Sequence, residues 1–332
     1  MKKTLLVVVV LIFTLCAFFF TLSSLGFDKI AHAVSTLSLP ALILFVFASL
    51  VNFTFMVYRW EAILQAGEKA SVSTLQLFWY RMVAYTVSYL VPSAQLGGEP
   101  FRVYFLEQNK IPRKKAVASV ILDKVFELSI TVIFTAIGFG LVIFRGADFN
   151  VASIIAIGLA VLFLSIFYYL TIFHGGFFTT LVRILKLHKV TRFATFVQKI
   201  QEMEELMQKF FHQHTFELIA SISISVLSFL VIILEYWIVL HFLGQHASFA
   251  QLLIISTIPM IAYAIPVPGA VGALEFSQLA AFTVAGLDPV LGITALLVIR
   301  ARDLVFIVIG TAYASSHGIH ILRKNTNIKP LA

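Results

Sequence analysis

The chain has 332 residues, of which 60% are apolar or aromatic and only 12% are charged. Soluble globular proteins contain about 45–50% apolar and about 25% charged residues, so a soluble fold of this length could not bury so much apolar surface. The composition and the mean hydropathy of +0.98 therefore exclude a soluble protein. Because the apolar runs are long and continuous, they predict an all-α polytopic membrane protein and not a membrane β-barrel.

The chain is basic, with 24 Lys and Arg against 16 Asp and Glu and a net charge of +8. In a membrane protein such an excess indicates Lys and Arg in cytoplasmic loops. Arginines do not interleave with aromatic residues as on a nucleic-acid surface, so we expect no nucleic-acid partner. The single cysteine, Cys16, excludes a disulfide framework and a multi-thiolate metal site.

Six apolar segments are long enough to span a bilayer: 4–24, 41–58, 116–144, 151–173, 215–243 and 288–316. The first of them could be a signal peptide. However, it is long enough to span, and the candidate cleavage site lies well beyond it, so we interpret it as a retained helix. In the polar stretch 174–214, apolar residues interleave with Arg and Lys, which predicts an amphipathic helix at the cytoplasmic membrane surface.

Two further apolar segments, 75–91 and 249–265, end at prolines and run into glycine-rich stretches. Irregular backbone at membrane depth is tolerated only inside protein or beside a water-filled cavity. We therefore expect two re-entrant broken-helix hairpins that return through 97–109 and 270–286. The breaks fall at Pro92, Gly97, Gly98, Pro266, Pro268, Gly269 and Gly272.

The distribution of Lys and Arg predicts the topology. If the hairpins enter from opposite sides, most basic residues, Arg59 among them, lie inside, and Arg81, Lys124, Arg300 and Arg302 remain at membrane depth. Both termini are then cytoplasmic in a multi-pass protein of a prokaryotic inner or plasma membrane, with six spanning helices and two hairpins. Counting eight transmembrane segments also puts both termini inside, but strands the basic residues of 102–115 outside.

The two hairpins look like copies. Val91-Pro92-x-Ala94 matches Val267-Pro268-x-Ala270 at an offset of 176 residues. The same offset relates three charged pairs: Glu99 with Glu275, Lys124 with Arg300, and Glu127 with Asp303. We therefore expect one transmembrane domain over 1–332: repeat 1 at about 41–144, a linking helix at 151–173, the amphipathic cytoplasmic segment 174–214, and repeat 2 at about 215–320. The linking helix inverts the second copy, which is the broken-helix plan of secondary transporters.

Charge at membrane depth costs several kcal/mol unless it is paired or hydrated. We expect two half-sites facing a shared central cavity, formed by Glu99, Arg102, Lys124, Glu127, Glu275, Arg300, Arg302 and Asp303. The pairs Glu99/Arg102, Lys124/Glu127 and Arg300/Asp303 are spaced i,i+3, so each pair shares a helix face.

In this interpretation Lys124 and Arg300, with Arg102 and Arg302, hold a phosphate. The carboxylates set the field, hold an amine or carry a proton. The alternative is that buried ion pairs merely fix helix register. Arg81 and Glu235, alone in apolar runs, are interpreted as structural. Tyr80, Tyr85 and Tyr89 line the helix that approaches the first break, where they either flank the site or lie in an interfacial belt; we favour packing or a belt.

Motifs for enzymatic chemistry are missing. The chain has no phosphate-binding G-x-x-x-x-G-K-[ST] loop, no H-E-x-x-H and no G-x-S-x-G. His212 and His214 have no nearby metal-ligand partner in the sequence. We expect no catalytic residues, no metal and no cofactor.

The first break, with Gly97-Gly98-Glu99-x-x-Arg102, and the second, with Pro268-Gly269, Gly272 and Glu275, resemble the transmembrane domain of the lysylphosphatidylglycerol synthase (multiple peptide resistance factor) family. The resemblance covers about 4–320, and the same domain occurs alone in flippase-like proteins. It implies lipid binding and translocation, with Glu99, Arg102, Glu275 and Arg300 as motif positions. The tail 317–332 is too short for the soluble aminoacyl-transferase domain of full synthases, so we expect that chemistry to be absent.

The first hypothesis is therefore a transporter that moves a phospholipid or polyprenyl-linked lipid between leaflets. Two alternatives stay open: a membrane-embedded lipid-modifying transferase, and a non-transporting subunit that presents lipid to a partner. A separate lipid-synthesising enzyme and a second copy of the chain, as a homodimer, are the protein partners considered.

Overall fold

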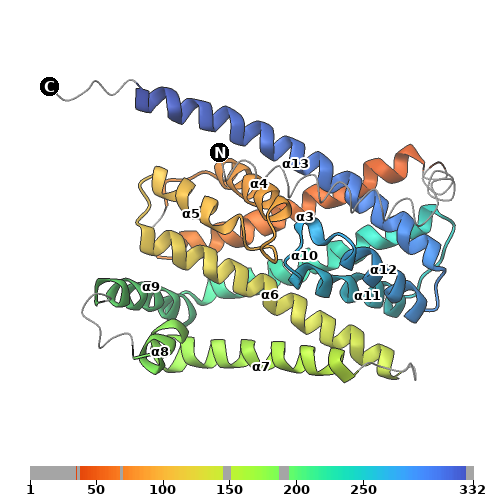
Figure 1. Ribbon diagram of the computed structural model, residues 1–332, viewed down its shortest axis with the longest axis horizontal. Helices are drawn as coiled ribbons and strands as arrows, with labels where there is room; N and C mark the ends of the chain where they lie inside the picture. The colour runs from red at the N-terminus through yellow and green to blue at the C-terminus, as the bar shows by residue number, and fades with distance from the viewer. Residues whose placement is uncertain (1–34, 36–37, 68–69, 145–150, 187–193, 327–332) are drawn as a thin grey trace.

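The computed structural model describes residues 35, 38–67, 70–144, 151–186 and 194–326. Within these ranges every regular element is helical (Figure 1), which confirms the all-α fold. The elements are α3 (Leu39–Gln65), α4 (Thr74–Leu90), α5 (Glu99–Gln108), α6 (Arg113–Phe144), α7 (Val151–Phe173), α8 (Phe177–Ile184), α9 (Ala194–Gln213), α10 (Thr215–Phe242), α11 (Phe249–Thr257), the 3-10 helices η3 (Ile258–Ala264) and η4 (Pro268–Ala270), α12 (Ala273–Val284) and α13 (Pro289–Thr326). The span expected at 4–24 lies outside the described residues.

Three described helices, α3, α6 and α10, are long and apolar enough to cross a membrane. A fourth candidate is the bent pair formed by Gly158–Phe173 of α7 and Phe177–Ile184, which meet at 98°. From Pro289 on, the span expected at 288–316 is part of α13, which carries three charged side chains there and is not among these candidates. The chain is thus an all-α membrane protein, and the count of six spans plus two hairpins stays a prediction.

Both hairpins begin with the same helix-capping device. Ser73 caps α4 with Gln76, and Ser248 caps α11 with Gln251; each serine side chain accepts from the glutamine N–H at 3.3 Å. Such a capping box satisfies two backbone donors that a helix start leaves free. The first arms lie at the expected positions: α4 ends at Leu90, and α11 continues as η3 to Ala264.

The two breaks share a backbone conformation as well as a sequence. Ala94 and Ala270, the alanines of the two Val-Pro-x-Ala motifs, both have positive φ angles, of 49° and 51°. Non-glycine residues rarely adopt this region. Two identical exceptions, 176 residues apart, support the interpretation of the hairpins as repeated units.

At the first break the two hairpin arms come into backbone contact. The N–H of Gly98 donates to the Ser88 hydroxyl at 2.9 Å, and a Cβ at Gly98 would lie 1.8 Å from the carbonyl oxygen of Ala84. No side chain fits at such a separation, so the close approach of the two backbone segments requires glycine at this position.

Gly98→Ala is therefore expected to lower the free energy of unfolding by at least about 3 kcal/mol, the upper end of typical overpacking. Gly140→Ala in α6 is the matched control, because no atom of the described residues lies within 4 Å of its Cβ position. Removing a helical glycine there is expected to raise stability by up to about 1 kcal/mol. Thermal unfolding in detergent measures both changes. Equal stability of the two variants would contradict the close approach.

The helices exchange partners between the repeats. The first arms cross over: α4 packs against α13, and α11 packs against α6. The second arms pack within their own repeat: α5 packs on α6, and α12 packs on α13. α3 and α10 form the most extensive pair, where Ser228 donates to the side chain of Asn52, the residue 176 positions earlier. Such reciprocal contact between equivalent positions is the pattern of a two-fold relation.

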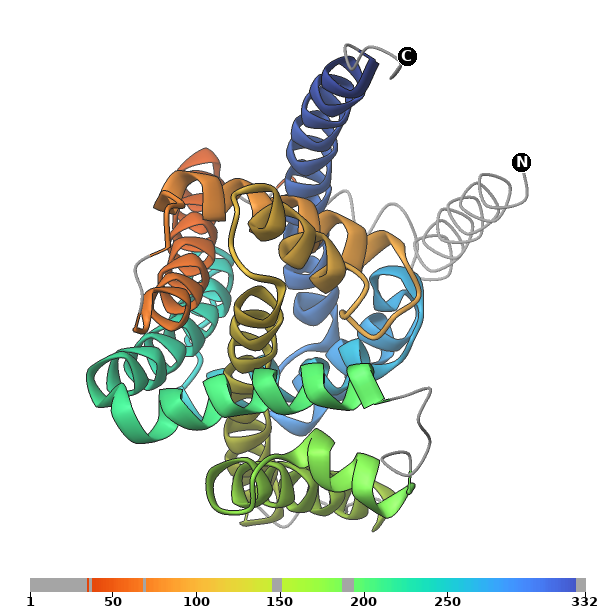
Figure 2. The ribbon, with the colours of Figure 1, turned by 90° about the vertical axis from the view of Figure 1, so that its left-hand side faces the viewer.

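The segment 174–214 forms two helices, α8 and α9, and its amphipathic pattern is confirmed. The apolar face of α9, with Met203, Met207 and Phe210, is buried against α6 and α7. α7 and α8 lie along one edge of the molecule, and α13 extends past the bundle at the opposite edge (Figures 1 and 2). Much of the apolar face of α9 is thus covered by protein.

Glu204 of α9 fixes the corner between α7 and α8. Its carboxylate accepts the N–H groups of Phe178 and Thr179, at 2.5 and 2.8 Å, at the start of α8. Burial raises the pKa of this carboxyl group, and the hydrogen bonds from Thr179 and Phe178 oppose the shift. The carboxylate also fills the space beside Gly176, whose φ is 122°.

Candidate functional site

A single buried carboxylate, that of Asp123 in α6, forms ion pairs with three arginines from three helices. It accepts Arg59 Nε at 2.7 Å, Arg81 Nη1 at 2.6 Å and Arg102 Nη2 at 2.7 Å, from α3, α4 and α5. Its side chain is fully buried. Breaking such a pair would leave uncompensated charge in a low-dielectric interior, so Asp123 holds three helices in register.

Three more charged groups form the accessible edge of this cluster. Lys124 lies 2.6 Å from Glu127 and 3.9 Å from Glu99, and Arg102 binds Glu99 at 2.8 Å. The side chains of Lys124, Glu99 and Glu127 are 13, 19 and 25% exposed. We call the seven groups the first cluster: Arg59, Arg81, Glu99, Arg102, Asp123, Lys124 and Glu127. Four cations face three carboxylates, so the first cluster carries one excess positive charge.

The second cluster lies at the other hairpin, around Arg300. Its guanidinium binds Glu275 at 2.9 Å and donates to the Tyr89 hydroxyl and the Gly269 carbonyl. The second carboxylate oxygen of Glu275 accepts the N–H of Gly272 at 2.6 Å, at the start of α12. Glu275 therefore caps the returning helix and neutralises Arg300 at the same time.

Arg302, two residues further along α13, binds two carboxylates. It binds Asp303 at 2.8 Å and Glu235 of α10 at 3.1 Å, and Tyr85 donates to Asp303 at 2.7 Å. The second cluster is defined as Glu235, Glu275, Arg300, Arg302 and Asp303. Two cations face three carboxylates, so it carries one excess negative charge.

One face of α4 connects the two clusters. Arg81, Tyr85 and Tyr89 recur every four residues, so they lie on one side of the helix. Arg81 reaches the first cluster, whereas Tyr85 and Tyr89 reach the second. Because Tyr89 also contacts Gly269, the two hairpin tips meet at Arg300.

The assignment of the tyrosines to packing or an interfacial belt was thus wrong for Tyr85 and Tyr89, which bind charged groups. Tyr80 stacks on Phe105 and accepts a hydrogen bond from Asn109. For Tyr80 the structure confirms packing.

Contacts at equivalent positions repeat in the two halves. The hairpin-tip carboxylate pairs with the cation of the long helix in both: Glu99 with Lys124, and Glu275 with Arg300. The equivalent serines Ser49 and Ser225 each accept from an arginine of the other half, namely Arg302 and Arg59. The offset of 176 also aligns Arg59 with Glu235, and this exchange of sign contributes to the opposite net charges of the clusters.

The structure brings together all eight expected charged residues, four in each cluster. Of the expected i,i+3 pairs, Lys124/Glu127 and Glu99/Arg102 are confirmed. Arg300 and Asp303 share a helix face as expected, but they bind other partners: Glu275 binds Arg300, and Arg302 binds Asp303.

The sequence did not reveal the partners of three further charged residues. Arg59 is not a cytoplasmic loop charge, because it is buried in α3 on Asp123. Arg81 and Glu235 are not isolated, since each binds an opposite charge of its cluster. Arg59 and Glu235 are separated by 176 residues, the offset of the repeat, and this spacing could have identified them in the sequence as equivalent positions.

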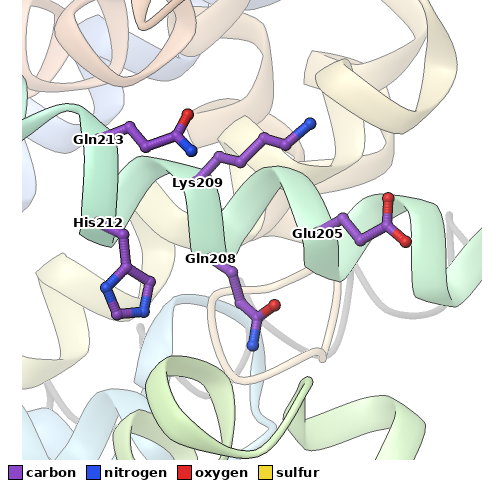
Figure 3. A pocket seen from close by; sticks show the side chains of 5 residues that line it. All are labelled: Glu205, Gln208, Lys209, His212 and Gln213. Carbon is purple, nitrogen blue, oxygen red and sulfur yellow. The ribbon is translucent and has the colours of Figure 1, made fainter.

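In this conformation the charged groups of the two clusters pair with one another. The described residues do form a hollow of about 260 Å³, but it lies beside α9. Its lining side chains all project from that helix (Figure 3): Glu205, Gln208, Lys209, His212 and Gln213. In the described ranges no three His, Cys, Asp or Glu side chains are placed to hold a metal ion.

Comparison with known proteins agrees with this architecture. Residues 5–310 match the family described as the lysylphosphatidylglycerol synthase TM region. The UPF0104 membrane protein MJ1595 of Methanocaldococcus jannaschii is 22% identical over 246 residues, which cover 71% of each chain. No solved structure matches. The chain thus belongs to the family of the lysylphosphatidylglycerol synthase transmembrane region.

Proposed function

We propose that the chain binds a phospholipid or polyprenyl-linked lipid by its head group and moves it between the leaflets of a prokaryotic cell membrane. The observation that carries this proposal is the meeting of two broken hairpins, each bearing a buried charged cluster, at Arg300. The proposal includes cytoplasmic N- and C-termini. An enzyme that makes the lipid would be a separate partner.

The charge of the clusters suits a polar head group. A phosphate replaces a carboxylate beside Lys124, which is partly exposed at the edge of the first cluster. Arginine and lysine bind phosphate through charge-assisted hydrogen bonds. The carboxylates Glu99 and Glu127 then face any amine on the same head group. The acyl or polyprenyl tails stay in the bilayer, so only the polar part crosses at the clusters.

Movement between two exposures follows from the crossed packing of the hairpins. Inverted-repeat transporters expose their site alternately by rocking one repeat against the other. Here the crossing contacts α4–α13 and α6–α11 are the surfaces that slide. In this proposal a head-group anion competes with the cluster carboxylates for the same cations.

The test is a translocation assay in sealed proteoliposomes with phospholipids labelled on the head group. Anionic, zwitterionic and aminoacylated lipids are compared, and protein-free vesicles give the background. We expect the protein to speed the movement of at least one head-group class above that background. Folded protein that moves none of these lipids, nor a labelled polyprenyl phosphate, would contradict the proposal.

A further inference from the structure

The two clusters differ in how well their carboxylates are neutralised. In the first cluster both oxygens of Asp123 accept arginine donors. In the second, Arg302 alone serves both Asp303 and Glu235. Two buried carboxylate oxygens, Glu235 Oε1 and Asp303 Oδ2, have no hydrogen-bond partner among the residues that the structure describes. The residues Glu235 and Asp303 are only 3 and 1% exposed.

A buried charge without a partner costs several kcal/mol in a low-dielectric interior, and ionisable groups there usually neutralise instead. Binding one proton is the smallest change that removes the excess negative charge of the second cluster. Asp303 holds the stronger anionic position, since it accepts two bonds from Arg302 and one from Tyr85. Glu235 accepts one bond from its cation Arg302, at 3.1 Å, and otherwise faces only one donor, the neutral hydroxyl of Ser49, among the described residues.

We propose that Glu235 is a proton-binding site: in this conformation it takes one proton from water onto Oε1 and makes the second cluster neutral. Nothing in the chemistry of Arg302 changes, because its guanidinium stays charged at all relevant pH values. A neutral Glu235 leaves Arg302 paired with one carboxylate instead of two. If the proposed lipid movement holds, Arg302 can then bind a head-group phosphate, so that proton binding and lipid binding are linked.

The surroundings of Glu235 contain no further cation in the described residues. The groups that face it from the helices packed on α10 are Arg302 and Asp303 of α13, Ser49 of α3 and Tyr85 of α4 behind Asp303, with Tyr236 on α10 itself. α11 has no ionisable side chain. The ionisable groups at the centre of α6 are paired in the first cluster. α9 joins the start of α10, about 30 Å along the helix axis from Glu235.

Infrared spectroscopy of the full chain in nanodiscs tests this site without any transport assay. Protonated carboxylic acids give a carbonyl band that carboxylates lack. We expect such a band in the wild type at neutral pH, shifted when glutamate is isotope-labelled, and fading as the pH rises. Glu235→Gln should lose it, whereas Glu205→Gln, a change at an exposed position on α9, should keep it.

Glu235→Gln resembles the protonated acid in shape, so it should fold, and its thermal stability should vary less with pH than that of the wild type. If the variant does not fold, the isotope shift in the wild type still decides. A wild type without the band, a band that glutamate labelling does not shift, or stabilisation by Na⁺ in place of the band would overturn the proposal. Lipid movement is measured separately, so a failed transport assay would leave this result intact.

Discussion

Asp123→Asn is expected to lower the free energy of unfolding by about 3–5 kcal/mol, the usual effect of removing one partner from a buried ion pair. Asp123 is fully buried and neutralises Arg59, Arg81 and Arg102. The asparagine keeps the shape but removes the charge, so the first cluster gains a second excess positive charge. Because the three arginines come from α3, α4 and α5, the loss should reach the whole first repeat.

Thermal unfolding in detergent or in nanodiscs measures this effect. Glu205→Gln on the exposed face of α9 is the control, and it should change stability by no more than about 0.5 kcal/mol. Arg81→Gln added to Asp123→Asn should recover part of the loss, because it removes one of the repelling charges. An Asp123→Asn variant as stable as the control would show that these contacts do not hold the helices together.

Arg300→Gln is the second change with a large expected effect. Arg300 binds Glu275, the Tyr89 hydroxyl and the Gly269 carbonyl, and so holds the two hairpin tips together. Its loss leaves Glu275 with only the N–H of Gly272 as partner. We expect a loss of about 3–5 kcal/mol, with greater proteolysis near the second break.

A double-variant cycle separates the contribution of the Arg300–Glu275 ion pair to stability from that of the other contacts of Arg300. Glu275→Gln in the Arg300→Gln background should cost less than it does alone, because the charge it removes no longer has a partner. Arg300→Lys is a natural comparison, since Lys124 occupies the equivalent position of the first repeat. Lysine keeps the charge but cannot reach three acceptors in a planar fork, so an intermediate loss is expected. Additive effects in the cycle would contradict the direct pairing.

The sequence predicted those features that depend on local chemistry. Prolines and glycines located the two breaks, and the matched Val-Pro-x-Ala motifs turned out to have the same backbone conformation. Spacing along one helix predicted the pairs Lys124/Glu127 and Glu99/Arg102. These results follow because turn geometry and i,i+3 contacts are encoded by neighbouring residues.

Contacts between distant helices were harder to predict. Arg59 and Asp123 are 64 positions apart, and nothing in the local pattern of either residue names the other. Arg300 and Asp303 share a helix face, but competition from Glu275 and Arg302 gives each another partner. Periodicity shows which charges share a face; only the packing of helices shows which opposite charge is nearest.

In the proposed mechanism, the hairpin-tip carboxylates Glu99 and Glu275 form the path of a lipid head group. The most direct measurement is the translocation rate of labelled lipid by the Glu99→Gln/Glu275→Gln double variant, beside wild type and the surface variant Glu202→Gln/Glu205→Gln. Gel filtration and thermal unfolding check that all three are folded. We expect movement to fall to the level of protein-free vesicles in the hairpin variant alone. A folded hairpin variant that moves lipid at the wild-type rate would contradict the claim.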